Sequence, residues 1–302
     1  NWTALMAKQL ALAEPCPAQT GLNGAAAQGF NVPVVKKAGC TNYAQGGARV
    51  TNPVGPGNAL LGGANATLGQ LTVPLVTQVS NHLTAVGGSF SGNEIVTVMA
   101  GGNDALINVG LYGATVAAAN AANPASVPAA AAAAGKTATA SMTTAGTELA
   151  TLIKDQILAK GAKYVVVVNL PNLAVTPFAA EQEAKLPGTT AVISSMTMAF
   201  NTALTTGLAG AGNVAMVDAY TVITDQYNNP ATYALSNVKE TACNLTSPSP
   251  NALGSSLVCN ASNTKPGDVS HYLFADTVHP TPYGYQLLAQ LVARQMAVAG
   301  WL

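Results

Sequence analysis

The run Lys163-Tyr164-Val165-Val166-Val167-Val168-Asn169-Leu170 constrains the fold more than any other stretch of this 302-residue chain. Its β-branched residues follow one another without polar alternation, which predicts a strand buried on both faces. Strands of this kind are typical of parallel sheets whose two faces are covered by helices. The run therefore predicts an α/β fold.

Two further apolar runs and the helical patterns between them extend this prediction. Residues 94–100 and 213–218 predict two more strands, and residues 143–160 and 189–208 predict long helices. Helices that alternate with strands are the pattern of a doubly wound parallel sheet with crossover connections. We expect one domain over residues 1–302, a three-layer sandwich with a central parallel sheet flanked by helices.

The other segments are predicted to be peripheral helices and loops. Helices are expected over residues 1–12, 65–83 and 282–298. Pro74 marks a kink or a break in the second of these helices. Residues 111–142 are rich in alanine and predict a surface excursion, part loop and part short helix. A loop is expected from residue 17 to residue 40, and residues 228–270 predict an irregular loop that carries a pair of cysteines.

The charge composition limits the classes of partner. The 12 basic and 12 acidic residues give a net charge of zero, so the chain has no overall field that would attract nucleic acid or an anionic membrane. We find no apolar run that approaches the length of a membrane span, and we expect no transmembrane segment. No signal peptide is present and Asn1 is not a start methionine, so we expect a processed chain.

The four cysteines are Cys16, Cys40, Cys243 and Cys259. None is in C-x-x-C spacing, and the chain has three histidines, which disfavours a zinc site; we expect no metal and no cofactor. Three pairings are possible, and we expect the two local ones, Cys16 with Cys40 and Cys243 with Cys259. Each disulfide would contribute about 3 kcal/mol in the chain-entropy model. The alternative is four buried free thiols. Disulfides favour a secreted or periplasmic protein.

The clearest candidate for catalysis is Asp276-Thr277-Val278-His279-Pro280. A neutral imidazole takes a proton from a nucleophile and returns it to a leaving group, provided that a carboxylate holds its other ring nitrogen in the correct tautomer. Asp276 and His279 are three residues apart, so one loop can supply both the carboxylate and the imidazole. The alternative is that Asp276 caps the following helix and that His279 packs beside it.

Two glycine-containing segments are candidates for oxyanion stabilisation. Gly46-Gly47 allows a backbone turn with positive φ, and its N–H groups could face an oxyanion or simply close a tight turn. Gly101-Gly102-Asn103-Asp104 follows a predicted strand, the position at which sites form in parallel sheets. Asn103 offers an amide donor there, and Asp104 could fix the loop or cap the next helix. The alternative is that both are plain turn residues.

Together these motifs resemble the SGNH, or GDSL-type, esterase and lipase family, and within it the secreted bacterial phospholipase and lecithinase-like branch. Asn42–Gly47 resembles the second block of the family, whose glycine donates a backbone N–H to the oxyanion hole. Gly101–Asp104 resembles the third block, G-x-N-D, whose asparagine donates a side-chain N–H. Asp276–Pro280 resembles the fifth block, D-x-x-H-P, which supplies the acid and the base of the triad. The resemblance runs in family order and implies a flavodoxin-like fold.

The first block of that family, G-D-S-L, has no counterpart that we can identify in these residues. Gly267-Asp268-Val269-Ser270 has the wrong order and lies six residues before Asp276, where no strand-to-helix turn is expected. Gly88-Ser89-Phe90-Ser91-Gly92 precedes a predicted strand instead of following one. We therefore expect the nucleophilic serine on a short N-terminal polypeptide of the same protein that is not part of these 302 residues. In this interpretation that polypeptide supplies the first strand of the sheet.

The resemblance implies an ester hydrolase that acts on a small-molecule or lipid ester. His279 would be the general base and acid, Asp276 would orient it, and Asn103 and the Gly47 N–H would stabilise the oxyanion. The alternative function is a secreted binding or structural module that has the same scaffold and no catalysis. A metal-dependent hydrolase that uses Asp276 and His279 as ligands is a third possibility, and two ligands are too few for it.

Overall fold

The computed structural model describes residues 1–24, 26, 31–62, 72–246 and 254–302. The fold is α/β, with a parallel sheet flanked by helices. The chain divides into two compact units. The first unit comprises residues 1–13, 171–194 and 217–302, and the second comprises residues 14–170 and 195–216. Helix α6 (Thr189–Gly207) passes from the first unit into the second.

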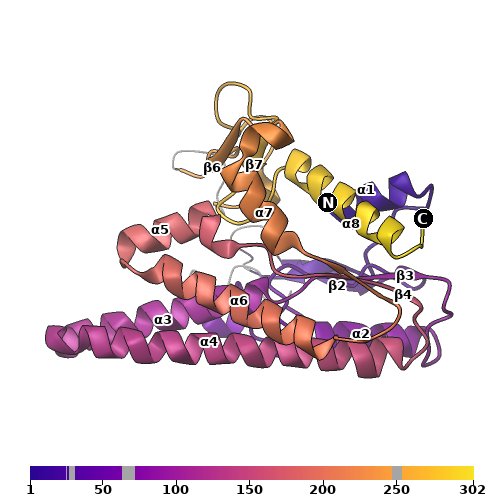
Figure 1. Ribbon diagram of the computed structural model, residues 1–302, viewed down its shortest axis with the longest axis horizontal. Helices are drawn as coiled ribbons and strands as arrows, with labels where there is room; N and C mark the ends of the chain where they lie inside the picture. Colours follow the sequence, from indigo (N-terminus) through magenta and orange to yellow (C-terminus); the bar gives the residue numbers. More distant parts are fainter. Residues whose placement is uncertain (25, 27–30, 63–71, 247–253) are drawn as a thin grey trace. The chain divides into compact units, whose positions relative to one another are not determined.

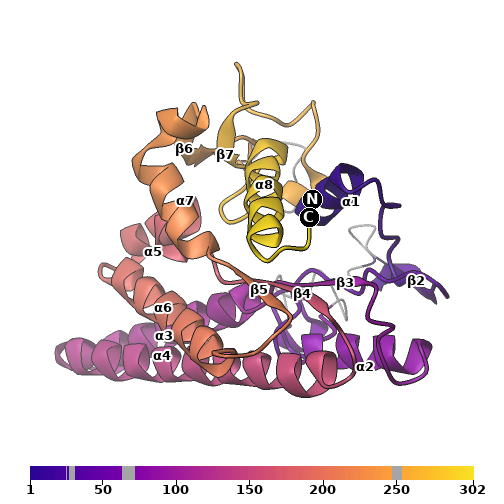
Figure 2. The same cartoon turned by 45° about the vertical axis from the view of Figure 1, so that its right-hand side comes forward.

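The parallel sheet of the second unit confirms the predicted strands. Its order is β3 (Ile95–Val98), β4 (Tyr164–Val168) and β5 (Val214–Val217), seen in Figure 2. Strands β3 and β4 are parallel, with Ile95 paired to Tyr164 and Val98 to Val167. The four valines of β4 are fully buried, as their uninterrupted apolar run predicts. Strand β3 is less buried, because Thr97 is exposed, and it lies at the edge of this sheet in the described part of the chain.

The alanine-rich region is helical, which corrects the predicted excursion of loops and short helices over residues 111–142. Helices α3 (Gly102–Ala122) and α4 (Val127–Leu152) pack side by side, joined by a short 3₁₀ turn that begins at Pro124 (Figure 1). The prolines lie in the first turns of the 3₁₀ turn and of α4, where a missing N–H costs nothing. Alanine has the highest helix propensity, so low complexity here indicates helix and not loop.

Helix α3 also corrects the expectation that no apolar run approaches the length of a membrane span. By length and composition alone, its 21 residues would suffice to cross a membrane. The mostly buried core helix of a folded domain satisfies the same test, but 28% of the apolar window of α3 is buried; Ala105, Val109 and Tyr112 are among its buried residues. A π-helical turn, Ile153–Leu158, then extends α4 toward β4 and confirms the predicted helix over residues 143–160.

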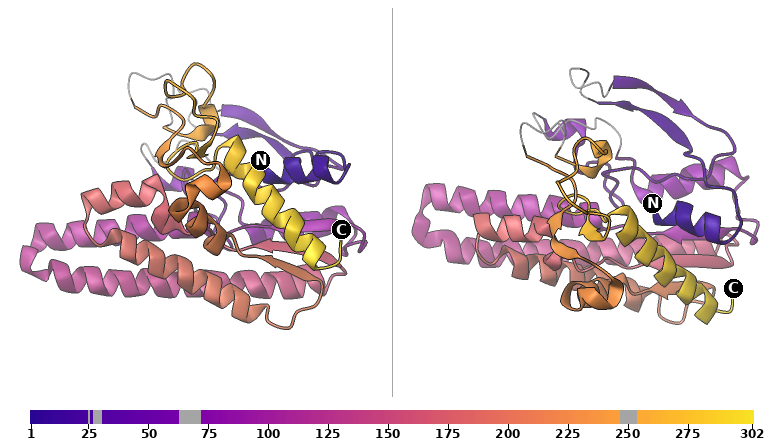
Figure 3. Two further views of the ribbon diagram at one scale, coloured as in Figure 1. Left: turned by 45° about the horizontal axis from the view of Figure 1, so that its top comes forward. Right: turned by 90° about the horizontal axis from the view of Figure 1, so that it is seen from above.

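A β-hairpin replaces the loop that was predicted before Cys40. Strands β1 (Gln19–Asn23) and β2 (Asn31–Lys36) are antiparallel and are visible in Figure 3. Gly21 and Pro33 argue against strands in a sequence pattern, yet both are tolerated because the hairpin is exposed and is not the interior of a larger sheet. The Cys16–Cys40 disulfide closes its base, as predicted. Helix α2 (Leu75–Ala85) begins after Pro74, so the predicted helix over residues 65–83 breaks there; residues 65–71 lie outside the described residues.

The first unit contains the two chain ends and the second disulfide. Helix α1 (Trp2–Gln9) packs on α8 (Pro282–Val298), and both helices were predicted. Helices α5 (Pro177–Lys185) and α7 (Ala219–Asn228) were not. Residues 228–270 are not wholly irregular, because β6 (Asn237–Thr241) pairs in parallel with β7 (Tyr272–Phe274). Four buried residues form a core around this pair: Leu235, Val238, Leu273 and Phe274. The Cys243–Cys259 disulfide is confirmed as well.

Candidate active site

Asp276 and His279 form a hydrogen-bonded pair in the first unit. The Nδ1 atom of His279 lies 2.8 Å from Oδ2 and 3.0 Å from Oδ1 of Asp276. The Asp276 side chain is 4% exposed, whereas that of His279 is 55% exposed. An ionised carboxylate only accepts hydrogen bonds, so Nδ1 carries the proton and Nε2 keeps its lone pair. In the described part of the chain Nε2 makes no hydrogen bond, which leaves it free to accept a proton.

Main-chain N–H groups complete the surroundings of the Asp276 carboxylate. Oδ1 accepts from the N–H groups of Val278 at 2.9 Å and His279 at 2.7 Å. Oδ2 accepts from the N–H of Ser256 at 2.7 Å. Burial alone would raise the pKa of Asp276, but the hydrogen bond and charge of His279 and these N–H donors outweigh it and lower the pKa. The Asp276 hydrogen bond in turn raises the pKa of His279, against the opposing effect of burial.

The loop that carries the pair is held at both ends. It follows β7 directly, and Ala275 donates its N–H to the His279 carbonyl at 2.8 Å, which closes the turn. Thr281 begins α8 as its N-cap, accepting from the Gly284 N–H at 3.1 Å and donating its hydroxyl to the Tyr272 carbonyl at 2.5 Å. The two groups are therefore fixed by a strand end and a helix cap, with Thr281 and not Asp276 capping the helix.

Gly47 lies in a turn of the second unit that only glycine fits. Its φ is +79°, and a Cβ there would lie 2.4 Å from the Pro56 carbonyl oxygen and 2.8 Å from Cγ2 of Thr72. Thr72 is itself buried and donates its hydroxyl to the Pro53 carbonyl at 2.5 Å. Among the described residues we find no acceptor for the Gly47 N–H. The turn therefore requires glycine, and its N–H is a donor that has no acceptor within the described part of the chain.

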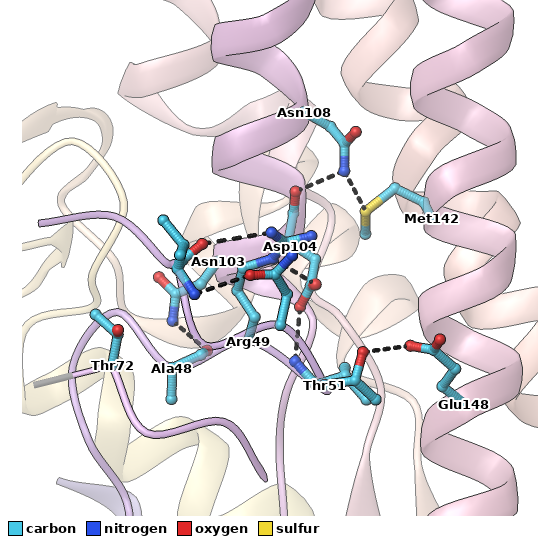
Figure 4. Close-up of polar contacts among 12 residues, drawn as sticks. Ala48, Arg49, Thr51, Thr72, Asn103, Asp104, Asn108, Met142 and Glu148 are labelled. Atoms are coloured by element: carbon cyan, nitrogen blue, oxygen red, sulfur yellow. Dashed lines mark hydrogen bonds and ion pairs between the residues drawn. The ribbon is translucent and has the colours of Figure 1, made fainter. Parts of the chain in front are cut away.

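Asn103 and Asp104 open helix α3 and bind the segment after Gly47 (Figure 4). The Asn103 side chain donates to the Ala48 carbonyl at 2.8 Å. Asp104 accepts from Nε of Arg49 at 2.9 Å and from the Val50 N–H at 3.1 Å. Three hydrogen bonds that involve two consecutive residues therefore fix the segment after Gly47 to the first turn of the helix. Asp104 was expected to fix its own loop or to cap the helix, and it instead binds Arg49 and Val50.

The Arg49–Asp104 ion pair is largely buried. The exposed fractions of the two side chains are 17% and 4%. Burial raises the pKa of Asp104, and the Arg49 guanidinium and the Val50 N–H oppose that rise. The sequence motifs assign no role to Arg49. Its position could have indicated one, because Arg49 is the single Lys or Arg between Lys37 and Lys136, and a lone cation in an apolar region requires a partner.

A family model of GDSL-like lipases and acylhydrolases matches residues 7–292. The chain belongs to this family. A search of curated proteins gave no match. Membership supports a hydrolase, and the two disulfides are compatible with an extracellular or periplasmic location.

The structure brings the predicted site residues of this GDSL-like chain together as two pairs. Asp276 and His279 are hydrogen-bonded in the first unit. In the second unit, Asn103 binds the carbonyl of Ala48, the residue that follows Gly47. The sequence pattern missed one contributor to the first pair, the Ser256 N–H, because a main-chain donor that is 20 positions distant has no residue signature. Within the described residues, no group of three His, Cys, Asp or Glu side chains could hold a metal ion.

The serines that were weighed as nucleophiles have turn roles. The Ser270 hydroxyl donates to Asp268 at 2.6 Å and precedes β7. The Ser91 hydroxyl donates to Glu94 and precedes β3. The nucleophile of an α/β hydrolase follows a strand, so these positions do not fit that role.

The other two histidines differ from His279 in their partners. His82 packs between the rings of Tyr43 and Phe90, with centroids at 5.4 and 4.8 Å, and burial lowers its pKa. It is a packed residue of helix α2. His271 stacks on Tyr283 at 4.2 Å, and its Nδ1 lies 2.6 Å from the Ala234 carbonyl oxygen. Among the three, and within the described residues, His279 is the one that is hydrogen-bonded to a carboxylate.

Proposed function

We propose that this GDSL-like protein is a serine-type carboxylic ester hydrolase of the esterase or lipase kind. The observation that carries the proposal is the contact of 2.8 Å between the buried Asp276 carboxylate and Nδ1 of the exposed His279. In the neutral ring this contact places the proton on Nδ1, so Nε2 is the unprotonated nitrogen and is directed away from the carboxylate. A general base for acyl transfer needs this tautomer.

His279 would act in both halves of the reaction. Its Nε2 accepts the proton of the serine hydroxyl as the oxygen attacks the ester carbonyl carbon. The resulting imidazolium is stabilised by the Asp276 carboxylate, which stays ionised because its pKa is lowered. The imidazolium then gives the proton to the leaving alcohol oxygen. Water hydrolyses the acyl-enzyme by the same two proton transfers, with His279 again as the base.

Gly47 and Asn103 would stabilise the tetrahedral oxyanion. The Gly47 N–H is unused in the described part of the chain, and an amide nitrogen has two N–H donors, of which Asn103 directs one at Ala48. Donors that are already fixed need no reorganisation when negative charge develops on the carbonyl oxygen. The three hydrogen bonds from Asn103 and Asp104 provide that rigidity.

The serine would be supplied by a short N-terminal segment of the same protein that is not among these residues. The substrate would be a small-molecule or lipid ester, and the protein would be secreted or periplasmic. A fluorophosphonate probe, which labels activated serines, tests the proposal on the protein that contains this segment. We expect label on the segment and none on residues 1–302 after denaturation. Label on a serine within these residues would contradict this assignment.

The second candidate function is a binding or structural module on the same scaffold without catalysis. It is favoured by the turn roles of Ser91 and Ser270. Hydrolysis of p-nitrophenyl esters of graded acyl length distinguishes the two functions. We expect turnover that His279→Ala abolishes and that His271→Ala, the matched control in the same unit, leaves unchanged. No turnover and no probe label would favour the module.

A further inference from the structure

The disulfide loop of the first unit contacts the Asp276 carboxylate directly. The Ser256 N–H donates to Oδ2 at 2.7 Å, and Oδ2 is the oxygen that lies closest to Nδ1 of His279. The other two N–H donors to Asp276 come from its own loop and reach Oδ1. Ser256 is therefore the one described donor that fixes this oxygen from a different part of the chain.

The Cys243–Cys259 disulfide connects the two sides of this contact. On one side, the Cys243 N–H donates to the carbonyl of Ala275, the residue before Asp276, at 2.9 Å. On the other, the Cys259 N–H donates to the Ser256 carbonyl at 3.1 Å. The disulfide joins these cysteines, so Ser256 is connected to the strand end that carries Asp276 through one disulfide and two main-chain hydrogen bonds.

A buried asparagine stabilises the same loop. Asn263 is 2% exposed, donates from Nδ2 to the Val258 carbonyl at 2.9 Å and accepts from the Asn260 N–H at 2.8 Å. Ser255 caps the short 3₁₀ helix Ser256–Val258, accepting from the Leu257 N–H at 3.3 Å. These hydrogen bonds hold the main chain at Ser256, and its own side chain takes no part in them.

We propose that the Ser256 main-chain N–H, held in place by the Cys243–Cys259 disulfide, is a positioning donor that shares Oδ2 of Asp276 with Nδ1 of His279 and so sets the basicity of the imidazole. This inference rests on the proposed function in one respect, namely that His279 is the general base. The donor disperses negative charge on Oδ2, so it moderates the basicity that Asp276 confers on the imidazole. Among the described residues, the other titratable group that interacts with the carboxylate is Tyr285 of α8, whose pKa is raised first by burial and then by the Asp276 charge.

The test removes the N–H without removing the loop. Ser256→Pro deletes the donor at the first position of a 3₁₀ helix, where proline is accepted. The preceding Ser255 has φ −138° and ψ 152°, the extended conformation that proline requires of the residue before it. Ser256→Ala is the matched control, because it removes the hydroxyl and keeps the N–H. The readout is the titration of the His279 ring by NMR, without substrate, with the His271 signal as the reference for a folded first unit.

We expect Ser256→Pro to raise the pKa of His279 by about 0.5–1 unit relative to Ser256→Ala, because one donor to the carboxylate is lost. The acidic limb of the kcat/KM profile should move to higher pH by the same amount. An unchanged or lowered pKa of His279 would overturn the proposal. The titration needs no turnover, so it can fail while ester hydrolysis is present, or succeed in a protein that lacks activity.

A second pair of variants tests the role of the disulfide. It also provides an independent test if the Ser256→Pro variant does not fold. Replacing Cys243 and Cys259 by serine should shift the His279 titration in the same direction as Ser256→Pro. Replacing Cys16 and Cys40 by serine removes the other disulfide, which lies in the second unit, and should leave the titration unchanged. Equal titrations of His279 in the two double variants would show that the Cys243–Cys259 disulfide does not hold the donor.

Discussion

The Asn103 side chain donates one hydrogen bond, of 2.8 Å, to the carbonyl of Ala48, the residue after Gly47. Only one of the two N–H groups of the amide is needed for this bond, so the same nitrogen holds the turn and keeps a second donor. In the part of the chain that the structure describes, that second donor has no protein acceptor. Asn103 thus combines a structural role with a donor available for an oxyanion.

The first prediction concerns this donor. Asn103→Ala should lower kcat by about 10²–10³ with little change in KM, because an oxyanion donor acts mainly in the transition state. Steady-state kinetics on a soluble ester would measure both constants. An effect confined to KM would instead make Asn103 a substrate-binding residue.

The second prediction concerns the pair Asp276 and His279. His279→Ala should abolish ester hydrolysis with the fold intact, and His271→Ala should retain the activity. Asp276→Asn should cost as much as the histidine substitution or less, through the wrong imidazole tautomer. Rates are compared at matched circular dichroism spectra. Normal turnover by the His279→Ala variant would refute the mechanism.

The third prediction follows from the directions of the two pKa shifts. Asp276 raises the pKa of His279 above 6.5, and hydrolysis needs the neutral ring, so kcat/KM should fall below a pH that is higher than 6.5. In Asp276→Asn this acidic limb should move to lower pH while the maximal rate falls. The pH profile of an uncharged ester substrate gives both quantities. A limb that does not move would show that Asp276 does not act on the base.

The same pair should make stability depend on pH. The lowered pKa of Asp276 stabilises the fold above its ordinary value of 3.8, and this contribution is lost as the pH falls. The raised pKa of His279 stabilises the fold below 6.5, and this contribution is lost as the pH rises through the folded value. Urea denaturation should therefore show the largest difference between wild type and Asp276→Asn between these two pH values.

The fourth prediction concerns the buried ion pair. Asp104→Ala leaves the Arg49 guanidinium and the Val50 N–H without their acceptor, which should destabilise the protein by about 3–5 kcal/mol. Adding Arg49→Met to Asp104→Ala should recover part of that loss, because the unpaired cation is then removed. Equilibrium unfolding in urea measures both. Equal free energies of unfolding of the single and double variants would show that the unpaired Arg49 guanidinium does not destabilise the protein.

The fifth prediction compares two adjacent glycines. Gly101 has φ +103°, and a Cβ there would lie 2.4 Å from the Phe200 ring, so Gly101→Ala should destabilise the protein strongly. Gly102 opens α3, and a Cβ there meets nothing closer than Leu170 at 4.0 Å. Gly102→Ala should therefore be neutral or stabilise by up to about 1 kcal/mol. Thermal unfolding of the two variants gives the comparison, and similar melting temperatures would contradict it.

The sequence predicted elements whose pattern is local and strong. The valines of β4 predicted a strand buried on both faces, and the regular apolar spacing of α8 predicted a helix with one buried face. Both predictions are confirmed, because the burial of an element dictates which of its positions must be apolar. Cysteine spacing likewise favoured both disulfides, since short loops close with little entropy loss. The pairing of Asp276 with His279 was predictable for the same reason, as three-residue spacing is a local property.

Tertiary contacts decided what the pattern could not. The alanine-rich segment forms two long helices, α3 and α4, that pack on each other. Alanine favours helix, but residue composition alone does not show which segment a helix packs against. The hairpin of β1 and β2 was missed, because Gly21 and Pro33 argue against strands and the valines of β2 are exposed instead of alternating with polar residues over a core. Strand β6 was missed because it exists only through its pairing with β7.

The sequence by itself determined the residue types of the candidate site, namely Gly47, Asn103, Asp276 and His279. Only the tertiary structure decided what holds them in place. Arg49 binds Asp104 from 55 positions away, and the Ser256 N–H binds Asp276 from 20 positions away. The physical reason is that burial of a charge must be compensated, while the compensating group can come from any segment that the fold brings within hydrogen-bond distance. A main-chain N–H belongs to every residue except proline, so no sequence pattern distinguishes the one at Ser256.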